Sequence, residues 1–81
     1  MKAETIRNRI NECITLFGFE YEGKGGNVDP CFIPEKKGYE YLLYFDGEEQ
    51  TVYDIDSVMN TPFIRGKTLN EVANEIEITE W

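Results

Sequence analysis

Residues 39–55, YEYLLYFDGEEQTVYDI, contain the strongest indication of the fold. The run from Tyr39 to Phe45 is dense in aromatic and aliphatic side chains, which is typical of a β-strand. Asp46-Gly47 is a favourable hairpin turn, so residues 50–55 are the predicted antiparallel partner. Because alternate residues of a strand face opposite sides of the sheet, we expect a central strand whose core-facing set is Tyr39, Tyr41, Leu43 and Phe45.

The register of this hairpin stays open at the level of sequence. A strict two-residue loop at Asp46-Gly47 places Leu43 opposite Gln50. A longer loop that ends at Glu49 pairs Leu43 with Val52 instead.

An amphipathic helix is predicted near the N-terminus, over residues 4–17. Gly18 is expected to end it, because glycine adopts the left-handed conformation at little cost, and Phe19 is then expected to pack back on Ile14. The helix has one apolar stripe at helical spacing: Ile6, Ile10, Cys13, Ile14 and Phe17.

Between this helix and the hairpin, the spacing of apolar residues changes from helical to alternating. Residues 19–22 predict a half-buried strand, followed by a flexible turn over residues 23–27. Residues 28–33 predict a further short strand. Pro30 and Pro34 lack amide donors, so we expect that strand at an edge of the sheet.

The C-terminal part predicts a helical turn and then a second helix. Residues 56–60 are expected to form the turn, with Asp56 as its N-cap. Thr68 and Glu71 have the spacing of a capping box. Residues 75–81 alternate, which indicates a final strand or an extended tail, and the terminal Trp81 is placed either on the body or against a partner. The apolar stripe of the second helix is Leu69, Val72, Ala73 and Ile76.

Together these elements predict one small α+β domain over residues 1–81. Its two layers are an antiparallel sheet of about three or four strands and, on one face of it, the N-terminal and C-terminal helices. A chain of 81 residues suits one domain with a small core. Aromatic residues make up 14% of the chain, which is enough to fill much of such a core.

Charge is distributed unevenly along the chain. Residues 1–39 contain equal numbers of acids and bases, whereas residues 40–81 supply the whole net charge of −8. This skew disfavours direct binding of nucleic acid and of anionic membranes. No segment has the length and apolarity of a transmembrane helix, and the charged N-terminus is unlike a signal peptide. We therefore expect a cytoplasmic protein whose partner is a protein with a basic surface.

Motifs for catalysis and for cofactor or metal binding are weak. Gly66-Lys67-Thr68 matches only the end of a phosphate-binding loop, because Thr61 stands where that loop needs a glycine. The sequence has no histidine. Cys13 and Cys31 are both expected to be reduced. Cys13 lies on the apolar stripe of the predicted helix, and the charge nearest to Cys31 is the acid Asp29, so neither is in the basic surroundings that activate a thiol. The acids do not have the spacing of a calcium-binding loop. The sequence predicts no enzyme, no cofactor and no metal site.

We expect a non-enzymatic protein-binding or regulatory module that acts through an acidic surface of its second half. One alternative is a DNA-mimic inhibitor, since the chain is similar in size and charge to small acidic proteins of phages and mobile elements. Another is a structural or self-assembling component. The candidate partner surface is Asp46, Glu48, Glu49, Asp54, Asp56, Glu71, Glu75 and Glu77.

Overall fold

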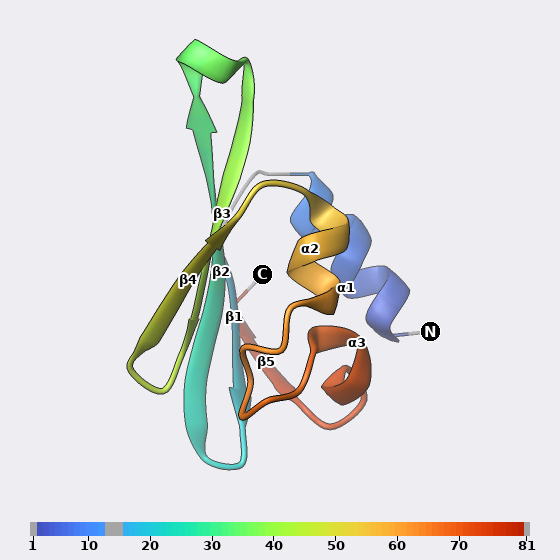
Figure 1. The fold of residues 1–81 in the computed structure, drawn as a ribbon. Coiled ribbons are helices and arrows are strands. Elements are labelled where there is room, and N and C mark those ends of the chain that lie inside the picture. The colour runs from blue at the N-terminus through green and yellow to red at the C-terminus, as the bar shows by residue number, and fades with distance from the viewer. Residues whose placement is uncertain (1, 13–15, 81) are drawn as a thin grey trace.

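The computed structural model describes residues 2–12 and 16–80. Within these residues, five strands form one antiparallel sheet in the order β4-β3-β2-β1-β5, and the helices lie on one face of it (Figure 1). The α+β class, the N-terminal helix and the layer of helices on one face are therefore as predicted. In chain order, the elements are α1 (Lys2–Asn11), β1 (Phe17–Tyr21), β2 (Lys24–Ile33), the 3₁₀ turn η1 (Pro34–Lys36), β3 (Gly38–Phe45), β4 (Glu48–Val52), α2 (Ile55–Asn60), α3 (Leu69–Val72) and β5 (Glu77–Glu80).

The expected count of three or four strands is too low for the described part of the chain. Residues 24–27, expected to be a flexible turn, belong to β2, and the turn before them is only Glu22-Gly23, where both residues have positive φ. The alternating C-terminal segment forms β5, which pairs with β1 and completes the sheet. The predicted C-terminal helix is shorter than expected and is followed by this strand.

The predicted N-terminal helix is too long, because α1 ends at Asn11 and Phe17 is already part of β1. Gly18 is not a helix cap but a strand residue. A Cβ atom at this position would lie 3.1 Å from both Thr79 Oγ1 and Glu80 Cβ, so the missing side chain lets β5 approach β1 closely.

Three expectations about the N-terminal and C-terminal parts fall on residues outside the described ranges. They are the place of Cys13 on the helical stripe, the contact of Phe19 with Ile14, and the place of Trp81.

The strand expected at an edge of the sheet is central instead. β2 pairs with β1 on one side and with β3 on the other. The amide of Asp46 donates to the carbonyl of Gly25, so odd-numbered residues of β2 direct their backbone groups toward β3. Pro30 therefore lies with its nitrogen toward the β1 side, where the pairing ends at Phe17 and Val28. No ladder hydrogen bond with β3 is lost at this proline.

The β3–β4 hairpin has the shorter of the two registers that the sequence leaves open. Leu43 pairs with Gln50, and the loop is the two residues Asp46-Gly47. Their φ angles of 49° and 90° match a type I′ turn, whose twist suits a two-residue hairpin.

The core lies between the sheet and the helices. Of the set expected to face it, Tyr41, Leu43 and Phe45 are buried, whereas Tyr39 is 39% exposed because β3 continues past the helices at this end. Phe19 is at the centre of an aromatic cluster, with ring centroids 5.8 Å from Phe17, 6.2 Å from Phe45 and 6.3 Å from Phe63.

The helix caps agree with the sequence in one case and differ in the other. The capping box of Thr68 and Glu71 is present in both directions, and the apolar stripe of that segment is buried as predicted. The N-cap of α2 is Asp54, not Asp56, because the Asp54 carboxylate accepts a hydrogen bond from the amide of Ser57. Asp56 instead forms an ion pair with Arg7, which joins α2 to α1.

Candidate functional site

Within residues 2–12 and 16–80, no helix packs against one of the two faces of the β-sheet (Figure 1). We call it the open sheet face; it consists of the strand residues that alternate with the buried ones. Its apolar centre is formed by Leu42 and Tyr44, which follow each other on this face of β3, and by Cys31 of β2, the diagonal neighbour of Leu42; all three side chains are half-buried. An uncovered apolar centre on a sheet is available for contact with another molecule.

Carboxylates surround this apolar centre. Across the described strands, the open sheet face has no lysine or arginine, since the one strand lysine, Lys24, pairs with the core-facing Tyr21 on the opposite face. Each of the five strands contributes at least one acid. The acids of the open sheet face are Glu20, Asp29, Glu40, Glu49, Glu77 and Glu80.

Several of these acids lie close to one another with the same sign of charge. Glu20 and Glu77 are direct cross-strand partners on β1 and β5. Asp29 and Glu40 are diagonal neighbours on β2 and β3, a relation that separates Cβ atoms by about 7–8 Å. Like charges directly opposite each other destabilise a sheet, so the pair of Glu20 and Glu77 does not serve the stability of the fold.

The pKa of the Cys31 thiol is influenced by the negative charges of this surface. It pairs directly with Glu40, and Asp29 lies two residues before it on the same face of β2. Partial burial raises the pKa of the thiol, and the negative charges of Asp29 and Glu40 raise it further. The thiol is not in a disulfide and is held in its neutral form, which is the opposite of an activated cysteine.

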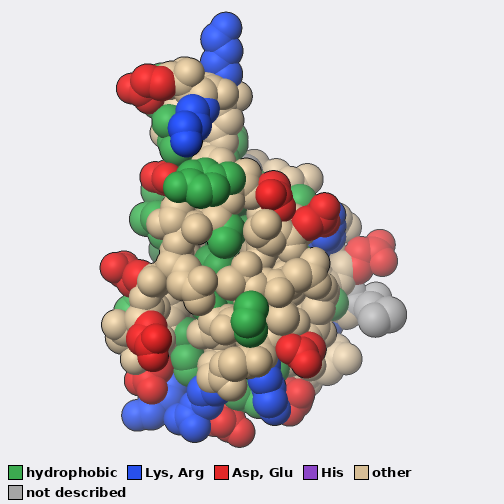
Figure 2. All heavy atoms as spheres, in the orientation of Figure 1, with side chains coloured by type: hydrophobic (Ala, Val, Ile, Leu, Met, Phe, Trp, Pro, Cys, Tyr) green, Lys and Arg blue, Asp and Glu red, His purple; other side chains and the backbone are tan. Residues whose placement is uncertain are grey.

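The structure divides the predicted partner surface among three places. Asp46, Glu48 and Glu49 lie together at the end of the β3–β4 hairpin, but only Glu49 belongs to the open sheet face. Glu77 is on the same face at its opposite edge, on β5. Figure 2 accordingly shows acidic side chains scattered over the visible side of the molecule rather than gathered in one patch.

The other four predicted residues belong to the layer of helices and the loops between them. Asp54 caps α2, Asp56 pairs with Arg7, and Glu71 forms the capping box of α3. Glu75 is exposed after α3. Three of these four carboxylates therefore make contacts within the chain.

Sequence reasoning missed most of the open sheet face, because it placed the candidate surface in residues 40–81. Glu20 and Asp29 belong to the charge-neutral first part, and Glu40 was assigned only to the face opposite the core. The available signal was the alternation itself, since each of these acids stands next to an apolar residue of a strand. Their presence on one surface depends on strand order, which alternation does not reveal.

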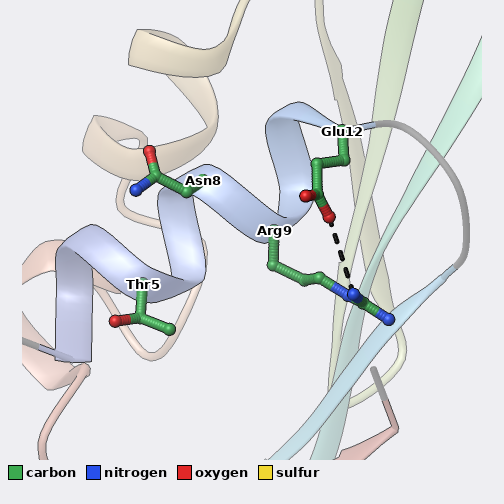
Figure 3. A pocket seen from close by; sticks show the side chains of 4 residues that line it. All are labelled: Thr5, Asn8, Arg9 and Glu12. Carbon is green, nitrogen blue, oxygen red and sulfur yellow. Dashed lines mark ion pairs between the residues drawn. The ribbon is translucent and has the colours of Figure 1, made fainter.

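Two hollows in the described surface have different characters. The larger, about 400 Å³ and shallow, lies along the outer side of α1 and is lined by Thr5, Asn8, Arg9 and Glu12 (Figure 3). Two of these residues, Arg9 and Glu12, form an ion pair of 3.5 Å. The smaller, about 150 Å³, lies at the end of the β3–β4 hairpin and is lined by Phe45, Asp46, Glu48, Gln50, Pro62, Phe63, Arg65 and Gly66. Both are smaller or more open than a typical pocket for a small-molecule ligand.

The contact of Lys67 Nζ with the Tyr21 hydroxyl, 3.3 Å long, raises the pKa of Lys67 and fastens the 64–67 turn to β1. Among the described residues, no group of three His, Cys, Asp or Glu is placed to hold a metal ion. The described helices also include none that is long and apolar enough to cross a membrane.

Comparisons of this chain with protein-family models, with curated proteins and with solved structures found no match.

Proposed function

We propose that this protein is a non-enzymatic binding module that docks a basic surface of a partner protein on its open sheet face. The observation that carries the proposal is the charge of that face. Within the described strands it has carboxylates around a half-buried apolar centre and no lysine or arginine.

The apolar centre of the open sheet face supports the proposal, because it resembles the centre of a protein interface. Such interfaces combine an apolar centre, often with aromatic side chains, and a polar rim. Leu42 and Tyr44 would supply the centre, and the acids around them would supply the rim.

Electrostatics selects the kind of partner. A surface of one sign attracts a surface of the opposite sign, which raises the association rate and discriminates against acidic proteins. A lysine or arginine of the partner placed between Glu20 and Glu77 would also relieve the repulsion between these paired acids.

A DNA-mimic inhibitor is a narrower form of the same proposal. It requires the basic surface of the partner to be a groove that binds nucleic acid, and it is favoured by the single sign of charge on the open sheet face. Competition separates the two forms. A short DNA duplex displaces this protein from the partner if the groove is shared, and leaves the complex intact if it is not.

The proposal is tested with two triple variants that each remove three negative charges. The first, Asp29→Asn with Glu40→Gln and Glu49→Gln, changes the open sheet face. The matched control changes exposed acids on the helical side: Glu4→Gln, Glu12→Gln and Glu75→Gln.

Each protein is immobilised and exposed to a lysate of the producing cell at about 0.05 M and about 0.5 M salt. Bound proteins are quantified by mass spectrometry. We expect to find a basic protein that binds the wild type and the control at low salt. The sheet-face variant should fail to retain this protein, and high salt should release it. Equal retention by the two variants contradicts the proposal.

A further inference from the structure

A second surface lies at the far end of the β2–β3 hairpin, on the side of the sheet opposite to the open sheet face. We call residues 30–40 the arm; they comprise the end of β2, the turn η1 and the start of β3. The arm projects beyond the layer of helices (Figure 1). Its helix-side surface therefore continues the core-facing stripe of the sheet with no helix over it.

The exposed large hydrophobic side chains of the described chain lie on this arm or, in the case of Tyr53, beside it. They are Phe32, Tyr39 and Tyr53, with exposed fractions of 56%, 39% and 59%. Phe32 and Tyr39 are direct cross-strand partners whose rings meet edge to face, with centroids 5.4 Å apart. Tyr53 joins them through Lys36, whose ammonium lies 4.9 Å from the centre of the tyrosine ring. Figure 2 shows hydrophobic and lysine side chains side by side at this projecting end.

This aromatic patch is costly to leave in water and is not used by the core. Aromatic residues are the commonest anchors of protein interfaces, because they bury large areas with little loss of side-chain freedom. Phe32 and Tyr39 also hold each other in place, so the patch is ordered before any partner arrives.

The net charge of the arm indicates what kind of partner binds there. Within residues 30–40, Lys36 and Lys37 balance Glu35 and Glu40, so the arm is neutral in a chain of net charge −8. Two copies of so acidic a protein repel each other over most of their surface. The arm has no net charge to oppose self-association, and the exposed large hydrophobic side chains of the described residues lie on it or beside it.

We propose that two copies of this chain associate through their arms, with Phe32, Tyr39 and Tyr53 at the centre of a twofold interface. The same patch faces itself across a twofold axis, which is the commonest symmetry of homodimers. The lysines of each turn then lie near the glutamates of the other copy. This association is independent of the proposed function, because it uses the helix-side surface of the arm and leaves the open sheet face accessible.

The test is the mass of the purified protein in solution, measured by sedimentation over about 1 μM to about 1 mM. The arm variant is Phe32→Ser with Tyr39→Ser, and the control is Leu42→Ser at the centre of the open sheet face. We expect the wild type and the control to approach twice the monomer mass. The arm variant is expected to raise the dissociation constant at least about tenfold, as loss of an interface anchor does.

A charge variant tests the same interface without removing an aromatic side chain. Lys36→Glu with Lys37→Glu makes both arms acidic, so dimers weaken at low salt and recover at about 0.5 M salt. Wild-type dimers are expected to change less with salt than dimers of the charge variant, because their arms have no net charge. A monomeric wild type over the whole range overturns the proposal, and so does association that survives the Phe32→Ser and Tyr39→Ser substitutions.

Discussion

The two faces of the sheet differ in the side chains that the same strands direct toward them and in how deeply these side chains are buried. On β3, Tyr41, Leu43 and Phe45 are buried under the helices, while the residues between them, Leu42 and Tyr44, are only half-buried on the open sheet face. The covered face is apolar and closely packed, and the open one combines apolar side chains with acids. Packing against the helices requires an apolar covered face. No contact within the described chain requires the mixture of apolar and acidic side chains on the open sheet face.

The comparison predicts that stability depends mainly on the covered face, and two adjacent leucines test this most strongly. Leu43→Ala removes a fully buried side chain and leaves a cavity, which should lower the free energy of unfolding by about 2–5 kcal/mol. Leu42→Ala makes the same chemical change on the open sheet face and should cost less than about 1 kcal/mol. Urea unfolding measures both values. Similar losses for the two variants would show that the faces contribute equally.

Two adjacent glycines give the next largest contrast. A Cβ at Gly26 would lie 2.5 Å from Phe19 Cζ and 2.9 Å from the carbonyl oxygen of Tyr44, so Gly26→Ala should overpack the covered face and cost about 1–3 kcal/mol. Gly25→Ala, on the open sheet face, meets no atom within 4 Å and should change stability by less than about 0.5 kcal/mol. Thermal unfolding of the two variants checks the difference, and a destabilised Gly25→Ala protein would contradict it.

A smaller effect, of opposite sign, is expected from the acids of the open sheet face. Glu77→Gln removes the repulsion with its cross-strand partner Glu20 and should stabilise the isolated protein by a few tenths of a kcal/mol, about 0.2–0.5. The gain should shrink as salt is added, because both side chains are exposed. A loss of stability would mean that Glu77 makes a favourable contact of its own.

The smallest energetic effect concerns the thiol on the same surface. The pKa of Cys31 is raised by partial burial and by Asp29 and Glu40, so a smaller fraction is thiolate at a given pH. Asp29→Asn with Glu40→Gln should lower that pKa and speed alkylation of Cys31 by iodoacetamide at low salt. Mass spectrometry of the peptide that contains Cys31 follows the rate. An unchanged rate would indicate that burial alone controls the thiol.

Local patterns were sufficient for the parts of the fold that depend on neighbours in sequence. The capping box of Thr68 and Glu71 and the core-facing residues Leu43 and Phe45 follow from spacing alone. Phe17 and Gly18 were misassigned to the helix and its cap, because an apolar residue at helical spacing followed by glycine matches a helix end as well as a strand. Phe17 and Gly18 are placed by their pairing with Val28 and Asn27 of β2, and Gly18 also by Glu80 of β5, some sixty residues away in the chain.

The candidate surface was harder to predict from the sequence than the fold. The uneven net charge led to a prediction that the surface lies in residues 40–81. Asp54 and Glu71 instead take part in helix caps, and Asp56 forms an ion pair within the chain. Glu20 and Asp29, from the neutral part, join Glu49 and Glu77 on one face only because β1 and β2 lie between β3 and β5.

By itself the sequence determined the class of the fold, the faces of its strongest strand and the acidity of the molecule, since each depends on composition or on spacing along the chain. Only the tertiary structure decided that β2 is central, that β5 closes the sheet beside β1, and that acids from all five described strands share an uncovered face. It also decided that Phe32 and Tyr39, at the end of the same hairpin, are left exposed. The physical reason is that strand pairing and helix placement are contacts between distant residues, and alternation along a strand specifies two faces without specifying which one the helices cover.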